Sequence, residues 1–127
     1  MPTRDNGFRL VDRTTRATIA RRVMLANSFF SRLRGLMFRK SLLPGEALFF
    51  IFARPGRNSV HMFFVRFPID LIYLDAGFRV VEVRNSLRPW RFHRSRVVSS
   101  YLIELPAGTV SRLEVSLGHE IRLEKGF

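Results

Sequence analysis

The sequence contains no cysteine, which excludes disulfides, thiol catalysis and cysteine-ligated metal centres. Glutamine is also absent, and Lys40 and Lys125 are the only lysines, so arginine carries nearly all of the positive charge. No apolar run approaches the roughly 18 residues of a membrane helix, and the first seven residues lack the apolar core of a signal peptide. We therefore expect a cytoplasmic protein without a membrane span. Nothing in the composition predicts an oligomeric state.

Recognisable catalytic and cofactor motifs are missing as well. There is no Gly-x-Ser-x-Gly nucleophile elbow and no glycine-rich phosphate loop. His61, His93 and His119 stand far apart and do not form the His-x-His pattern of a cupin-type metal site. We expect no metal and no cofactor, and the sequence favours a non-catalytic protein over an enzyme.

The apolar content is sufficient for a folded core. Of the 127 residues 46% are hydrophobic and 13 are phenylalanine, so burial can offset the conformational entropy lost on folding. A chain of this length without repeats or a low-complexity linker predicts a single domain, residues 1–127, with its core at about residues 8–124.

The hydrophobic pattern predicts mainly β structure. Short apolar and β-branched segments, separated by turn residues, indicate an antiparallel β-sandwich or a partly open barrel of jelly-roll type with two short helices. Strands are expected at 8–12, 18–25, 47–52, 59–64, 69–74, 78–83, 97–105 and 120–124, with an irregular stretch at 85–96. Alternation within 78–83 places Val80 and Glu82 on the same side of the strand. The helices are expected within 27–37, capped by Asn27 or Ser28, and at 109–113, capped by Thr109.

Three sequence blocks carry a family resemblance: Arg-Gly-Leu-Met-Phe at 34–38, His-Met-Phe-Phe-Val-Arg-Phe-Pro-Ile-Asp at 61–70, and Glu-Leu-Pro-Ala-Gly at 104–108. Together they resemble a bacterial and archaeal family called domain of unknown function 192, over about residues 18–123. The resemblance implies a compact β-sandwich with short helices and no agreed activity or cofactor. Many relatives have a small polar step where this chain has Phe63, Phe64 and Val65, so a polar pocket is not carried over from them.

Two carboxylates interrupt apolar strands. Asp70 and Glu104 lie among residues that exclude water, where a carboxylate must be paired, hydrogen-bonded or neutral. One interpretation makes them an acid–base pair or ligand anchors, with His61 close by. The other, which we favour, is structural: Asp70 accepts backbone N–H groups near Pro68, or either carboxylate holds an arginine.

The most distinctive functional segment is 84–96, which contains five arginines and no acid. Aromatic and guanidinium groups alternate along it at Arg88, Trp90, Arg91, Phe92 and Arg94. This combination is typical of surfaces that stack bases while arginines bind phosphates. The alternative is that Trp90 anchors the loop on the core and the arginines are merely solvated.

The net charge of +12 and a pI near 11.7 favour an anionic partner, although codon usage alone can produce an arginine excess. A second acid-free run at 13–45 would form one basic face with 84–96 if the fold brought them together. We therefore expect a non-catalytic binding module for an anionic ligand, preferably single-stranded nucleic acid. The alternative is a small-molecule binding protein or enzyme with a pocket near His61, Asp70 and Glu104.

Overall fold

The computed structural model describes residues 7–26, 42–62 and 65–125, which contain ten strands and one short helix. The helix expected within 27–37 lies outside these ranges. The strands are β1 (Phe8–Asp12), β2 (Ala17–Ala20), β3 (Arg22–Ala26), β4 (Glu46–Gly56), β5 (Ser59–His61), β6 (Ile69–Leu74), β7 (Val80–Leu87), β8 (Phe92–Arg94), β9 (Ser99–Pro106) and β10 (Ile121–Lys125). The helix is α2 (Thr109–Leu113).

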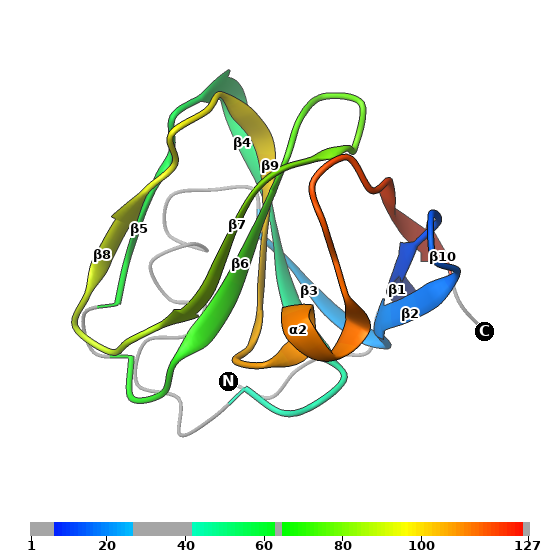
Figure 1. Ribbon diagram of the computed structural model, residues 1–127, viewed down its shortest axis with the longest axis horizontal. Helices are drawn as coiled ribbons and strands as arrows, with labels where there is room; N and C mark the ends of the chain where they lie inside the picture. The colour runs from blue at the N-terminus through cyan, green and yellow to red at the C-terminus, as the bar shows by residue number, and fades with distance from the viewer. Residues whose placement is uncertain (1–6, 27–41, 63–64, 126–127) are drawn as a thin grey trace.

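The strands form three sheets, with strand orders β10-β1-β2, β3-β4-β9-β6-β7 and β5-β8. The five-stranded sheet stands in the middle, with the three-stranded sheet on one side and the β5–β8 pair on the other (Figure 1). The sheets do not close into a barrel, and the arrangement is sandwich-like. The predicted mainly β, sandwich-type class is therefore confirmed.

The segment predicted as one strand at 18–25 is two strands in different sheets. The break falls at Arg21, where the backbone N–H groups of Arg21 and Arg22 both donate to the carbonyl oxygen of Gly45, at 2.9 and 3.0 Å. The chain thereby leaves β2 and enters β3, which pairs with β4 in parallel. The other strand pairs in the described residues are antiparallel, and a hairpin pattern in the sequence does not show which sheet each half joins.

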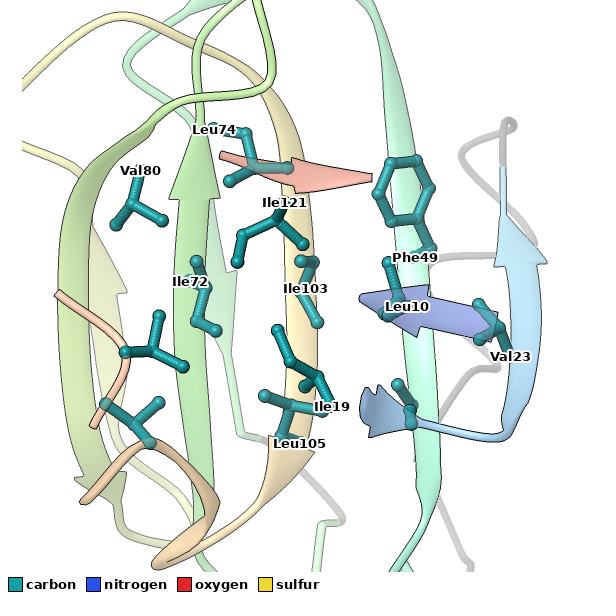
Figure 2. Close-up of a cluster of buried hydrophobic side chains, with 14 residues drawn as sticks. Leu10, Ile19, Val23, Phe49, Ile72, Leu74, Val80, Ile103, Leu105 and Ile121 are labelled. Carbon is teal, nitrogen blue, oxygen red and sulfur yellow. The ribbon is translucent and has the colours of Figure 1, made fainter. Parts of the chain in front are cut away.

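Each face of the five-stranded sheet covers its own apolar cluster. The first cluster lies between this sheet and the three-stranded sheet, and includes Leu10, Ile19, Phe49, Ile72 and Ile103 (Figure 2). The second lies on the opposite face and includes Leu48, Met62, Leu71, Tyr73 and Leu102. A strand buried on both faces has apolar residues throughout instead of alternating ones, and all six residues of β6 are buried.

A bulge in the pairing of β6 with β7 reverses the predicted side of Glu82. Tyr73 stands opposite Glu82, but Leu74 stands opposite Val80, so Val81 is the extra residue. Val80 consequently packs in the first cluster, while Glu82 shares the face of Tyr73. The expectation that Val80 and Glu82 share a side is wrong, since one inserted residue changes the face.

The start of α2 also differs from the prediction. Gly108, at φ 94°, is the N-cap residue, and the N-cap residue itself supplies no side-chain cap. Thr109, expected as the cap, instead donates its hydroxyl to the carbonyl oxygen of Pro106 at 2.7 Å. The first N–H groups of the helix are therefore available to another acceptor, which is Asp70.

Candidate nucleic-acid interface

Two aromatic side chains are exposed beside arginines around β8. Trp90 is 59% exposed and Phe92 is 62% exposed, although large apolar side chains usually lie inside a protein. The neighbouring arginines are exposed too. We call this set the β8 surface: Arg88, Trp90, Arg91, Phe92 and Arg94.

Local backbone geometry presents the β8 surface. The N–H of Arg91 donates to the carbonyl oxygen of Arg88 at 3.2 Å, and that of Trp90 donates to Met62 at 2.8 Å. Trp90 has a positive φ of 64° within this turn. Because side chains alternate along a strand, Phe92 and Arg94 point to the same side of β8. These main-chain hydrogen bonds hold the turn, and more than half of the Trp90 side chain is exposed.

The three arginines of the β8 surface make no ion pair with any described residue. Within the described ranges, no carboxylate oxygen lies within 4.0 Å of the guanidinium groups of Arg88, Arg91 or Arg94. Such guanidinium groups remain available to phosphates.

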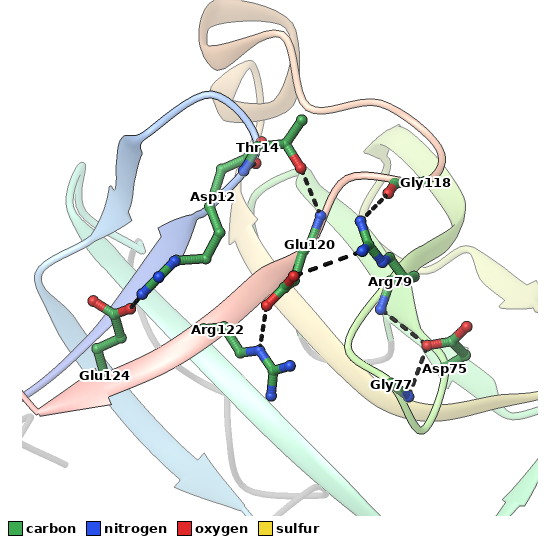
Figure 3. Close-up of polar contacts among 10 residues, drawn as sticks. Asp12, Thr14, Asp75, Gly77, Arg79, Gly118, Glu120, Arg122 and Glu124 are labelled. Atoms are coloured by element: carbon green, nitrogen blue, oxygen red, sulfur yellow. Dashed lines mark hydrogen bonds and ion pairs between the residues drawn. The ribbon is translucent and has the colours of Figure 1, made fainter.

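Three arginines around the three-stranded sheet are paired with carboxylates. They make the bonds Arg13–Glu124 at 2.6 Å, Arg122–Glu120 at 2.6 Å and Arg79–Glu120 at 3.7 Å (Figure 3). Glu120 and Glu124 therefore pair with arginines on that side of the molecule, whereas Arg88, Arg91 and Arg94 have no such partner among the described residues.

The second basic run does not join the β8 surface as far as it is described. Arg13 and Arg16 belong to the turn between β1 and β2, in the sheet on the far side of the molecule from β8 (Figure 1). Arg21 and Arg22 lie where the chain passes from β2 to β3. Four further members lie outside the described residues: Arg32, Arg34, Arg39 and Lys40. The expectation of one continuous basic face is therefore not met by Arg13 and Arg16.

Asp70 has a structural role that matches its prediction. Its side chain is 1% exposed, and one carboxylate oxygen accepts the N–H of Ser86 at 2.9 Å. The other oxygen accepts the N–H groups of Gly108 at 3.0 Å and Val110 at 2.9 Å. The expectation that Asp70 is buried and accepts backbone hydrogen bonds is confirmed. This carboxylate joins β7 to the start of α2.

Asp70 and Glu104 are not brought together. In β6, Asp70 alternates with Leu71 and Tyr73 of the second cluster, so it lies on the face of the first cluster. Glu104 stands opposite Leu71 and therefore lies on the other face. The backbone of His61 pairs with that of Phe92, and its side chain lies outside the description. A pocket built on both carboxylates does not form, because the sheet separates them.

Glu104 is an ionisable group in apolar surroundings. It is 7% exposed and has Leu48 and Leu71 as its cross-strand neighbours. Burial raises the pKa of Glu104 from 4.5 to about 8, because desolvation penalises the charged carboxylate. The side chain is therefore mostly a neutral carboxylic acid at neutral pH.

A chain of three polar groups lies behind β8, and sequence reasoning missed it. The hydroxyl of Tyr73 is 3.1 Å from Nδ1 of His93, and Nε2 of His93 is 3.3 Å from Oε2 of Glu82. The other oxygen of Glu82 accepts the N–H groups of Arg96 at 2.6 Å and Val97 at 3.4 Å. These residues come from β6, β7 and β8 and share no sequence motif, so only the packed fold reveals them.

Burial also favours the neutral forms of the His93 and Tyr73 side chains. It lowers the pKa of His93, an effect that the Glu82 carboxylate opposes, and it raises the pKa of Tyr73 further above its ordinary value. A neutral imidazole has one donor and one acceptor nitrogen. The Tyr73 hydroxyl then donates to Nδ1 of His93, and Nε2 of His93 faces Oε2 of Glu82 at 3.3 Å.

Neither a metal centre nor a membrane helix is found in the part of the chain that the structure describes. No three His, Asp or Glu side chains gather there as metal ligands. Among those same residues, no helix combines the length and the apolar character needed to cross a membrane.

Comparisons with known proteins agree with the fold and assign no activity. The sequence profile of DUF192, described as Uncharacterized ACR, matches residues 10–123. A UPF0127 protein from Thermococcus sibiricus is 38% identical over 119 residues, covering 91% of this chain and 74% of that protein. Another from Pyrococcus horikoshii is 40% identical over 102 residues, covering 79% and 85%.

Two solved structures are similar over most of the chain. A protein from Sinorhizobium meliloti, described as a "putative transcription regulator", has a TM-score of 0.81 and 27% identity, with 91% of each chain covered. A protein of unknown function from Novosphingobium aromaticivorans has a TM-score of 0.80 and 21% identity, with 91% of this chain and 82% of that chain covered. The second similarity shows the fold alone.

Proposed function

Since the chain belongs to the DUF192 family of uncharacterised proteins, we propose a function from its own surface: it is a non-catalytic module that binds single-stranded nucleic acid through the β8 surface. The observation that carries this proposal is the exposure of Trp90 and Phe92 among arginines that have no carboxylate partner within the described ranges.

The chemistry of the β8 surface suits a single strand. Exposed aromatic rings stack on unpaired bases without regard to sequence, each contributing about 1–3 kcal/mol. Guanidinium groups beside them bind the phosphates, and the released counterions make affinity salt-dependent. In a duplex the bases are stacked on each other, so few base faces are available to stack on Trp90 and Phe92.

Two further observations support a nucleic-acid partner. The net charge of +12 attracts a polyanion, and the Sinorhizobium meliloti protein with the same fold is described in terms of transcription. The alternative pocket near His61, Asp70 and Glu104 has less support, because Asp70 is occupied by three backbone N–H groups and faces away from Glu104.

We expect measurable binding of a fluorescein-labelled oligothymidylate at low salt, followed by fluorescence anisotropy at three salt concentrations. Trp90→Ala should weaken binding by about 1–3 kcal/mol and leave the dependence of log K on log salt unchanged, because a stacking contact is uncharged. Arg91→Ala should reduce the slope by about 0.7, the contribution of one phosphate on a single strand.

Matched controls remove the same kinds of group elsewhere. Leu117 is 67% exposed and Arg112 is exposed on α2, which packs at the first cluster, on the other face of the five-stranded sheet from β8. Leu117→Ala and Arg112→Ala should bind like the wild type, and far-UV circular dichroism verifies that all variants are folded. Absence of wild-type binding at low salt, or unchanged binding in both Trp90→Ala and Arg91→Ala, would rule out this function. Equal affinity for a duplex of the same length would contradict the stacking mechanism.

A further inference from the structure

The inner side of β8 is tied to the five-stranded sheet by one side chain. Phe92 and Arg94 point outward, so His93 between them points inward. There it contacts Tyr73 of β6 and Glu82 of β7. The ring centroids of Tyr73 and His93 are 5.7 Å apart. His93 therefore links the strand that carries the β8 surface to two strands of the neighbouring sheet.

Glu82 fixes the chain immediately after β8 as well. One oxygen binds His93, and the other accepts the N–H groups of Arg96 and Val97. The main chain of the β5–β8 pair is closed at its ends by Met62 N–H to Arg91 at 2.8 Å and Ser95 N–H to Asn58 at 3.0 Å. A two-stranded pair is marginal by itself, so its position on the sheet depends on its contacts there: the packing of Val60 in the second cluster on the β5 side, and the His93 contacts on the β8 side.

We propose that His93 is the positioning residue of the β8 surface, and that protonating it loosens β8 from the sheet, so that nucleic-acid binding weakens as the pH falls below neutrality. This inference rests on the proposed function for its binding readout. The claim that His93 attaches β8 to the sheet does not depend on that function and can be tested without a ligand.

Protonation of His93 disturbs its hydrogen bond with Tyr73. At Nδ1 a new N–H would face the Tyr73 hydroxyl, which must then turn and lose its own acceptor. Burial and the charges of Arg84 and Arg96 disfavour the imidazolium, while Glu82 favours it. The remaining neighbours do not stabilise it: Val60 stands opposite on β5, and Glu104, which influences Tyr73, is mostly neutral at neutral pH. These surroundings therefore favour the neutral imidazole of His93.

The sign of the pH dependence of binding distinguishes loosening of β8 from a direct effect of the positive charge on His93. A histidine that gains a proton beside a phosphate-binding surface adds a positive charge, which by itself strengthens binding as the pH falls. Loosening of β8 has the opposite effect, because Phe92 and Arg94 are then no longer held in one geometry. The direction of the pH dependence therefore decides between the two.

The first measurement is oligothymidylate anisotropy from about pH 7.5 to about pH 5.5 at constant ionic strength, a range in which histidine titrates. The dissociation constant of the wild type should rise about five- to tenfold, as for the loss of one or two hydrogen bonds. His93→Gln, which keeps a donor and an acceptor but does not titrate here, should show a flat profile. His119→Gln alters the other described histidine–carboxylate contact, His119 to Asp12 at 2.8 Å, and should keep the wild-type profile.

The second measurement needs no nucleic acid. Hydrogen exchange of the Met62 and Ser95 amides should be about fivefold faster or more in Tyr73→Phe, which lacks the hydroxyl that His93 binds. The Arg13 amide, bonded to Glu120 at 2.8 Å in the three-stranded sheet, should be unaffected, which excludes a global loss of stability.

The outcomes separate the two proposals. If the wild type does not bind the oligonucleotide but Tyr73→Phe accelerates exchange at Met62 and Ser95, the proposed function fails and the attachment of β8 by His93 stands. If binding occurs but strengthens as the pH falls, or if exchange is unchanged in Tyr73→Phe, the positioning role of His93 is wrong.

Discussion

Glu104→Gln is expected to stabilise the protein by about 5 kcal/mol at pH 9 and to have little effect near pH 5. The wild-type carboxyl must either ionise among apolar neighbours or stay protonated, and burial raises its pKa from 4.5 to about 8. Each pH unit of that difference corresponds to about 1.4 kcal/mol. Glutamine has nearly the same shape and carries no ionisable proton.

The direction of this pH dependence follows from the difference in proton binding to Glu104 between the folded and unfolded states. Between pH 4.5 and about 8, the folded state keeps the proton on Glu104 whereas the unfolded state has released it. Stability contributed by this group is therefore fully present below pH 4.5 and is lost as the pH rises to about 8. The difference in unfolding free energy between variant and wild type should grow through this range and then level off.

Urea denaturation followed by circular dichroism at several pH values measures this difference. Glu114→Gln is the matched control, because Glu114 is exposed at the C-terminal end of α2 and its replacement should leave the wild-type pH profile nearly unchanged. A constant difference between Glu104→Gln and the wild type from pH 5 to pH 9 would show that Glu104 ionises normally in the folded protein.

Asp70→Ala is expected to destabilise the protein by about 4–6 kcal/mol. The substitution removes an acceptor for three backbone N–H groups, those of Ser86, Gly108 and Val110. Hydrogen bonds to a charged group contribute about 1.5–3 kcal/mol each, and a buried donor left without a partner has a further cost. Because small domains are stable by only about 5–15 kcal/mol, much of the stability should be lost.

Guanidinium denaturation tests this expectation, with two comparison variants. Asp70→Asn keeps one carbonyl oxygen and should lose about half as much, because its amide nitrogen cannot accept the remaining N–H groups. Asp75→Ala removes an acceptor for Gly77 and Arg79 in an exposed turn, at 2.9 Å each, where water replaces it. If Asp70→Ala is no less stable than Asp75→Ala, the three buried bonds do not hold the fold together.

Features that depend on local pattern could be predicted from the sequence. The turn from Arg13 to Arg16 between apolar segments indicated the β1–β2 hairpin, which forms, and Asp70 within an apolar run indicated a buried acceptor. The apolar alternation and turn residues sufficed for these because each depends on a few neighbouring residues. The family resemblance pointed to the same fold class.

Features that depend on pairing between distant strands could not be predicted. The side of Glu82 is set by a bulge against β6, and the break at Arg21 is set by a carbonyl group from Gly45. The contact of Tyr73 with His93 then requires β8 to lie over β6. None of these is visible in local periodicity, which explains why His93 looked isolated in the sequence.

The pairing of β1 with β10 bears on how the chain folds during synthesis. Arg13 and Glu124, which are bonded beside these strands, are 111 positions apart. β1 therefore emerges from the ribosome long before its partner, and the edge it shares with β10 stays open until the last strand is made. Contacts of such large sequence separation form late and slow folding. Apolar residues of the first cluster, Leu10 among them, remain exposed in the meantime, so nascent chains that lack β10 are expected to aggregate or to need chaperones.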